Sequence, residues 1–77
     1  MIKGIFNLNG ARYSMTLLTR TVKLPPIGTE IYDPITETFY ILRAVNPNGH
    51  CYVQNKISGY GFTLPTIYGM WIIEKIK

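Results

Sequence analysis

The chain has 77 residues, of which 47% are hydrophobic and 16% are charged, and its formal net charge is +4. This length allows one domain, over residues 1–77, and the density of apolar side chains excludes a disordered chain. No apolar run approaches the ~20 residues of a membrane-spanning helix, and the single cysteine excludes an internal disulfide, so we expect a cytoplasmic protein without membrane contact.

Residues 2–17 predict a β-hairpin. Asn9-Gly10 is a strong signal for a two-residue turn, because both central residues of a type I′ turn need a positive φ angle. With that turn Leu8 faces Ala11, and apolar side chains of the two strands share one face. The other face carries polar side chains, with Ile5 as its only apolar one. This alternation is typical of an antiparallel pair with one dry and one wet face.

Turn and strand signals continue along the rest of the chain. The alternation changes phase near Leu17-Leu18, which predicts a bulge or a bend, and Pro25-Pro26 ends that segment because proline donates no ladder hydrogen bond. The segment 58–69 predicts a glycine-hinged strand or loop in which 65–68 suits a single 3₁₀ turn. Further strands are expected over 29–32, 39–45, 51–55 and 70–76.

The whole pattern predicts an all-β fold. No window supports a helix of about ten residues or more, and β-branched and aromatic residues dominate. We expect a small antiparallel barrel with five or six strands, of the SH3-like or the OB-like type, because closure removes the free sheet edges that invite aggregation.

The residues that catalysis requires do not come together in the sequence. His50 is the only histidine, and the adjacent Cys51 would point to the opposite strand face, so the two cannot form a nucleophilic pair. The four acidic residues are well separated, and no His, Cys and Asp cluster has metal-ligand spacing. We therefore expect a non-enzymatic protein with no catalytic residues, no cofactor and no metal.

Gly59-Tyr60-Gly61-Phe62 resembles the centre of the RNP1 motif of cold-shock and RNA-recognition domains, although Ser58 stands where that motif has a basic residue. The resemblance implies that Tyr60 and Phe62 stack on the bases of a single-stranded nucleic acid, with Tyr52 alongside. The phosphate contacts would then come from Lys3, Arg12, Arg43 and Lys56.

The stretch from Gly61 to Tyr68 is similar to the segment before the last strand of SH3 domains. In that family a proline and a tyrosine, here Pro65 and Tyr68, line a groove for Pro-rich peptides. The N-terminal tyrosine motif and the acidic loop of the family are missing, and Trp71 follows the segment instead of preceding it. The resemblance supports an SH3-like barrel more than it supports peptide recognition.

These observations favour a binding protein that docks on a macromolecular partner, first of all a protein surface. An accessory factor or inhibitor of the phage or mobile-element type fits a small domain without catalytic groups. The alternative is the single-stranded nucleic-acid binder described above. Aromatic side chains carry much of the energy of protein interfaces. The expected partner contacts, which would also serve a homo-oligomer, are Tyr40, Tyr52, Tyr60, Phe62, Tyr68 and Trp71.

Overall fold

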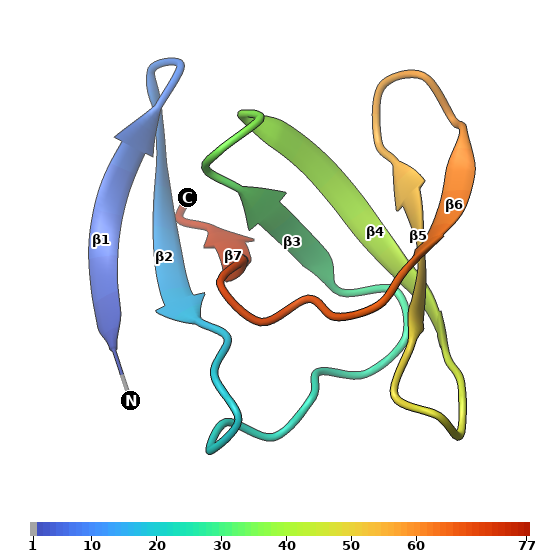
Figure 1. Cartoon of the computed structure of the whole chain (residues 1–77). Coiled ribbons are helices and arrows are strands. Elements are labelled where there is room, and N and C mark those ends of the chain that lie inside the picture. The colour runs from blue at the N-terminus through green and yellow to red at the C-terminus, as the bar shows by residue number, and fades with distance from the viewer. Residues whose placement is uncertain (1) are drawn as a thin grey trace.

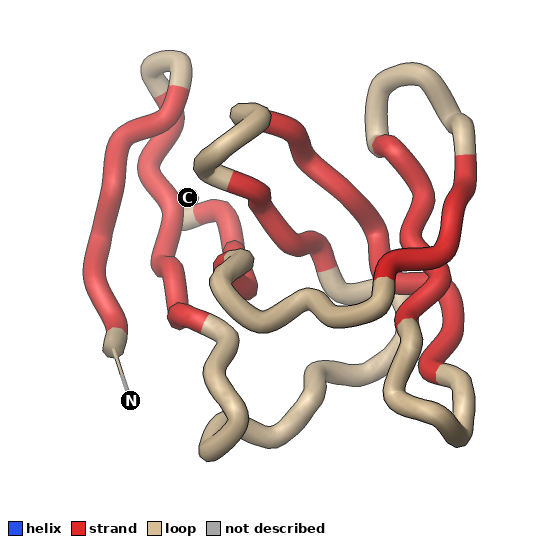
Figure 2. The backbone as a smooth tube through the Cα atoms, viewed as in Figure 1, coloured by secondary structure: helices blue, strands red, loops and turns tan. Residues whose placement is uncertain are grey.

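The computed structural model describes residues 2–77 and shows a single sheet of seven strands (Figure 1). Loops and turns form the remainder of these residues, without a helix (Figure 2). The predicted all-β, antiparallel fold is therefore confirmed. The strands are β1 (Lys3–Leu8), β2 (Ala11–Leu17), β3 (Glu30–Asp33), β4 (Thr38–Val45), β5 (Cys51–Asn55), β6 (Gly61–Leu64) and β7 (Trp71–Lys75).

The strand order is β1-β2-β7-β3-β4-β5-β6, so the last strand along the chain lies between β2 and β3. The sheet has seven strands and not the five or six predicted, because Gly61–Leu64 forms a strand of its own beside β5. The sheet is also open, which corrects the prediction of a closed barrel. The hairpins β1–β2 and β5–β6 lie at opposite ends of the sheet, and β1 and β6 do not pair (Figure 1).

The β1–β2 hairpin has the predicted register, with Leu8 opposite Ala11 and every pair in step as far as Lys3 and Thr16. Asn9 and Gly10 both have positive φ, at 53° and 82°, as a type I′ turn requires. The Gly10 N–H donates a hydrogen bond to Asn7 Oδ1 over 3.0 Å, which fixes the turn from inside.

The change in the apolar alternation near Leu18 coincides with the end of β2 and not with a bulge. The register shift that the structure does contain lies between β4 and β5. The Leu18 N–H donates to the carbonyl of Met70 over 2.8 Å, so the chain leaves β2 and turns the Leu18 side chain into the core. The bulge lies in β4, where the register with β5 shifts between Leu42 and Ala44. Arg43 is the extra residue, and its side chain is exposed.

The segment between β6 and β7 contains no 3₁₀ turn, which corrects the prediction for 65–68. A β-turn follows instead, in which the Met70 N–H donates to the Ile67 carbonyl over 3.1 Å. Gly69 has a φ of 94°, which lies outside the 3₁₀ region. Glycine adopts this value without steric cost because it has no Cβ atom. Ile67 is fully buried and anchors the segment against the sheet.

Two apolar clusters lie on opposite faces of the central strands. Because successive residues of a strand point to opposite faces, Ile72 of β7 joins one cluster while Ile73 joins the other. The larger core contains Leu18, Ile31, Tyr40, Leu42, Cys51, Val53 and Ile67. The smaller core contains Met15, Tyr32 and Ile73, with Leu8, Tyr13, Phe39 and Trp71 packed against them.

Candidate functional site

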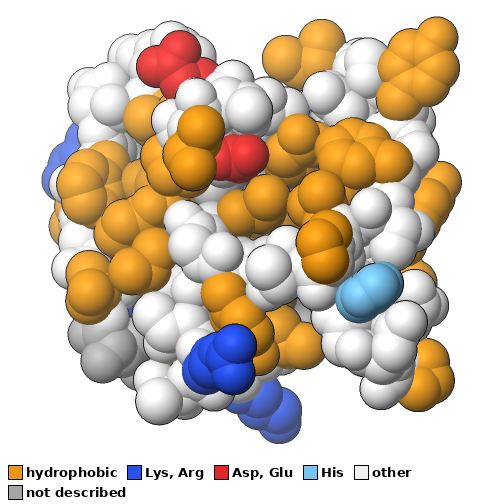
Figure 3. Space-filling model, in the orientation of Figure 1, with side chains coloured by type: hydrophobic (Ala, Val, Ile, Leu, Met, Phe, Trp, Pro, Cys, Tyr) orange, Lys and Arg blue, Asp and Glu red, His pale blue; other side chains and the backbone are white. Residues whose placement is uncertain are grey.

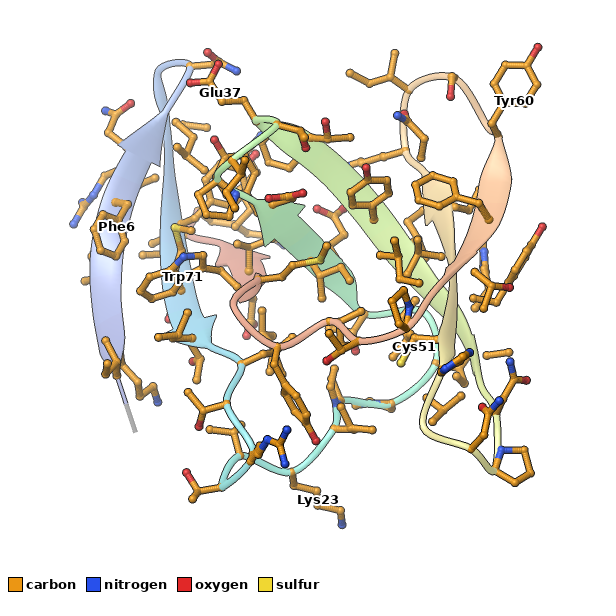
Figure 4. The ribbon with its side chains drawn as sticks, viewed as in Figure 1. Phe6, Lys23, Glu37, Cys51, Tyr60 and Trp71 are labelled. Atoms are coloured by element: carbon orange, nitrogen blue, oxygen red, sulfur yellow. The ribbon has the colours of Figure 1, made fainter. Side chains whose placement is uncertain are left out.

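Aromatic side chains from five strands gather on the smaller-core side of the sheet. The rings of Phe6 and Trp71 meet edge to face, with centroids 5.6 Å apart and planes at 62°, and Figure 4 shows them side by side. Phe39 lies between two tyrosines, 4.9 Å from the ring of Tyr32 and 6.2 Å from that of Tyr13. We call these five side chains the aromatic face. Phe6 is exposed, Tyr13, Phe39 and Trp71 are partly exposed, and Tyr32 is buried. Figure 3 shows that hydrophobic side chains reach the surface over much of this view of the molecule.

Three adjoining hollows run along the aromatic face, and we call them together the groove. The largest, of about 480 Å³, opens where β7 diverges from β3 after only two residue pairs. Tyr13 and Lys56 are shared with a hollow of about 310 Å³, which continues past Ile57. Leu8 and Phe39 are shared with a third hollow of about 350 Å³ beside Glu37. The groove therefore extends from the end of β7 to the tip of the β1–β2 hairpin.

The charges along the groove differ from those of the chain as a whole. Three acidic side chains line it, Glu30, Glu37 and Glu74, against two basic ones, Lys56 and Lys75. Lys56 Nζ and Glu30 Oε1 form a partly exposed salt bridge over 2.6 Å, so these two charges offset each other and leave Glu37 and Glu74 against Lys75. The chain carries a net charge of +4, but its groove has a small acidic excess.

Tyr32 presents a neutral phenol at the third hollow. Burial raises the pKa of Tyr32, and the negative charges of Glu37 and Asp33 raise it further. Asp33 is held in the β3–β4 turn, where its carboxylate accepts hydrogen bonds from the Ile35 N–H at 2.9 Å and the Thr36 hydroxyl at 3.0 Å. The phenol keeps its proton and can donate a hydrogen bond to a ligand in this hollow.

The six aromatic residues expected to contact a partner do not form one surface. Trp71 belongs to the aromatic face, whereas Tyr68 lies half-exposed in the loop before β7. Tyr40 is only 8% exposed, because its ring meets that of Phe62 edge to face across β5, with centroids 5.5 Å apart. A buried Tyr40 cannot serve as a contact on the surface, and this part of the prediction is corrected.

The β5–β6 hairpin carries Tyr60 and Phe62 of the RNP1-like stretch together with Tyr52, but the three side chains do not form a platform. Phe62 packs on Tyr40, and the Tyr52 ring lies over Gly61, where a Cβ atom would overlap the Tyr52 hydroxyl. Tyr60 is 78% exposed, precedes β6, and points away from the sheet (Figure 4). The expected joint stacking surface is therefore divided between these side chains.

The four basic residues expected to contact phosphates are also dispersed. Lys3 and Arg12 lie on β1 and β2, at the opposite end of the strand order from β6. Lys56 pairs with Glu30, and the Arg43 Nε–H donates to Gln54 Oε1 over 2.8 Å. The fold forms no basic stripe beside Tyr60 and Phe62.

His50 and Cys51 differ in their exposure to solvent. His50 is exposed in its turn, whereas Cys51 is 1% exposed in the larger core, and burial raises the pKa of its thiol. Within residues 2–77 no group of three or more His, Cys, Asp or Glu side chains could hold a metal ion.

The residues that line the middle of the groove were missed by the sequence reasoning. Leu8, Tyr13, Phe39 and Ile57 come from four separate segments, and only the placement of β7 between β2 and β3 brings these segments together. The hairpin pattern does assign Leu8 and Tyr13 to one apolar face, which is the signal that could have pointed to this surface.

In the described part of the chain no helix is long and apolar enough to cross a membrane. Comparisons of the chain with protein-family models, with curated proteins and with solved structures find no match.

Proposed function

We propose that this protein is a non-catalytic binding domain that docks on a protein partner through the groove along its aromatic face. The observation that carries the proposal is the row of Tyr13, Phe39 and Leu8 beside hollows open to solvent. Partly exposed aromatic and aliphatic side chains next to a concavity are typical of sites that accept an apolar anchor residue. An accessory factor or inhibitor would act by such docking alone.

The charge of the groove supports a protein over a nucleic acid. Phosphate binding draws its affinity from lysine and arginine, but outside the Lys56–Glu30 pair the groove has only Lys75 against Glu37 and Glu74. A segment with apolar side chains and a flanking lysine or arginine complements this surface.

The test compares two isoleucines that are equally exposed, Ile57 at 89% and Ile35 at 91%. Because both side chains are exposed, Ile57→Ser and Ile35→Ser should have similarly small effects on folding. The two residues differ in that only Ile57 lines the groove. The tagged wild-type protein is used to capture a partner from a cell lysate, and the partner is purified. The affinity of this partner for each of the two variants is then measured by calorimetry. We expect Ile57→Ser to weaken binding by about tenfold, or about 1.4 kcal/mol, and Ile35→Ser to leave it unchanged. Equal affinities of the two variants would show that the groove is not the docking site.

The same proteins are titrated with a labelled single-stranded oligonucleotide at about 50 mM and about 200 mM salt. Under the proposal, binding is weak at both salt concentrations and unaffected by Tyr60→Ala. Tight binding that disappears with salt and with Tyr60→Ala would instead establish the nucleic-acid alternative, with the β5–β6 hairpin as its site.

A further inference from the structure

The two edges of the sheet differ in how they are protected. The Asn55 N–H donates to the Tyr60 carbonyl, and the alternation of an antiparallel ladder then leaves only Gly61 and Thr63 of β6 with outward backbone groups. Pro65 follows and has no N–H to offer, so this edge is short and blocked. β1 is six residues long, pairs with β2 without a bulge, and contains no proline. Its one charged residue, Lys3, lies at the first position, so the rest of the strand is uncharged and can act as a template for another strand.

The free groups on β1 can be assigned from the hairpin. The Leu17 N–H donates to the Ile2 carbonyl over 2.9 Å, and hydrogen-bonded pairs alternate along the ladder. The backbone groups of Gly4, Phe6 and Leu8 therefore face β2. Those of Lys3, Ile5 and Asn7 face solvent, and all three residues are exposed.

We infer that β1 pairs with β1 of a second copy of this chain, antiparallel and about a two-fold axis through Ile5. Ile5 then lies opposite Ile5 of the second copy, and Lys3 lies opposite Asn7 of the second copy. Every outward N–H and carbonyl of these three residues finds a partner in both copies. Ile5, which is 61% exposed in the single chain, loses most of that exposure.

The side chains fit this register on both faces of the strand. On the face of Ile5, each lysine meets a neutral asparagine, so no like charges stand opposite each other. On the other face, Phe6 lies opposite Gly4 of the second copy. The Phe6 ring already leans over its own Gly4, since a Cβ there would lie 2.8 Å from Phe6 Cε2. The two Phe6 rings, each 44% exposed in the single chain, therefore meet above two glycines that leave room for them.

A second copy fits this edge because a two-fold interface requires a patch that is complementary to itself. The stretch Lys3-Gly4-Ile5-Phe6-Asn7 has an apolar centre flanked by polar residues that differ in charge. A shift by two residues would set Ile5 opposite Lys3 or Asn7 and leave fewer outward groups paired. The central register is therefore favoured over its neighbours.

The test is a charge exchange at the two-fold axis. Sedimentation equilibrium compares four samples: the wild type, Ile5→Lys, Ile5→Glu and an equimolar mixture of the two variants. The protein concentration runs from about 10 μM to about 1 mM, the range in which a small interface associates. We expect the wild type to approach twice its mass of 8.8 kDa, each variant alone to remain at 8.8 kDa, and the mixture to recover the dimer. Recovery requires residue 5 to face residue 5, and it also shows that both variants are folded.

Thr63→Lys provides the matched control on the edge strand β6, and we expect it to dimerise as the wild type does. Neither Ile5 nor Thr63 lines the groove, so the outcome is independent of partner binding. Three results would each overturn the inference: a wild type that stays at 8.8 kDa throughout, a dimer that survives Ile5→Lys, or a dimer that is lost in Thr63→Lys.

Discussion

Cys51 combines chemical reactivity with complete burial. Its Sγ lies 3.7 Å from the Gly49 carbonyl, burial raises the pKa of the thiol, and the side chain packs in the larger core. Only the thiolate reacts with a disulfide reagent, so the folded protein should be labelled about a hundredfold more slowly than the protein in strong denaturant. The rate of reaction with a chromogenic disulfide measures this difference.

The matched control moves the cysteine by one position along the same turn. In the double variant His50→Cys, Cys51→Ala the thiol occupies an exposed site, and labelling of the folded protein should be fast. Equally fast labelling of wild-type Cys51 in native buffer would show that the β4–β5 end of the core opens readily.

Tyr32 makes the free energy of unfolding depend on alkaline pH. Its pKa in the folded protein is raised above the ordinary value of 10.0 by burial and by Glu37 and Asp33. The unfolded state therefore loses the proton first, and stability declines as the pH rises above 10.0. Urea denaturation between about pH 8 and about pH 11 measures the free energy of unfolding on both sides of that value. This free energy should decline less with rising pH for Tyr32→Phe than for the wild type. Identical declines would mean that Tyr32 ionises as freely in the folded protein as in the unfolded one.

At the scale of elements, β7 is the strand on which the sheet depends. It pairs with β2 on one side and with β3 on the other, and it gives Ile73 to the smaller core and Ile72 to the larger. Ile73→Ala leaves a cavity in a site that is 4% exposed and should cost about 2–4 kcal/mol. The exposed neighbour provides the control, since Glu74→Ala should change the stability by less than about 0.5 kcal/mol.

Urea denaturation of the two variants separates packing from strand propensity. Both substitutions replace a β7 residue with alanine, so a shared loss would reflect propensity alone. A loss confined to Ile73→Ala locates the energy in the smaller core. A protein of this length has a stability of about 4–12 kcal/mol, so the Ile73 variant should be close to the limit of folding.

The elements predicted correctly are those whose signals are local. Asn9-Gly10 fixes the β1–β2 register, and the alternation of Cys51 and Val53 with exposed residues defines β5 with its observed bounds. The strand order depends on pairings between distant segments, and no local signal places β7 between β2 and β3. The local signals therefore predict a closed barrel, whereas the sheet is open.

The same distinction explains the site. Tyr40 has the alternation of a strand residue, but its burial depends on Phe62, which lies two strands away and 22 positions later in the chain. Trp71 is predicted to contact a partner, and it lies partly exposed on the aromatic face beside Phe6. The groove itself requires the divergence of β7 from β3, which is a property of tertiary structure.

At the scale of the whole molecule, the two cores share their strands. β3 contributes Ile31 to the larger core and Tyr32 to the smaller, and β7 does the same with Ile72 and Ile73. Loss of either core therefore removes the strands that complete the other, so the protein should unfold in a single cooperative transition.

Trp71, the only tryptophan, packs on the smaller core and reports on it by fluorescence, while far-UV circular dichroism reports on all seven strands. In urea the two signals should change with the same midpoint and the same slope. An earlier fluorescence transition would mean that the smaller core opens while the larger remains folded. Coincidence would instead mean that the two cores unfold together, so that the aromatic face keeps its folded arrangement for as long as the larger core does.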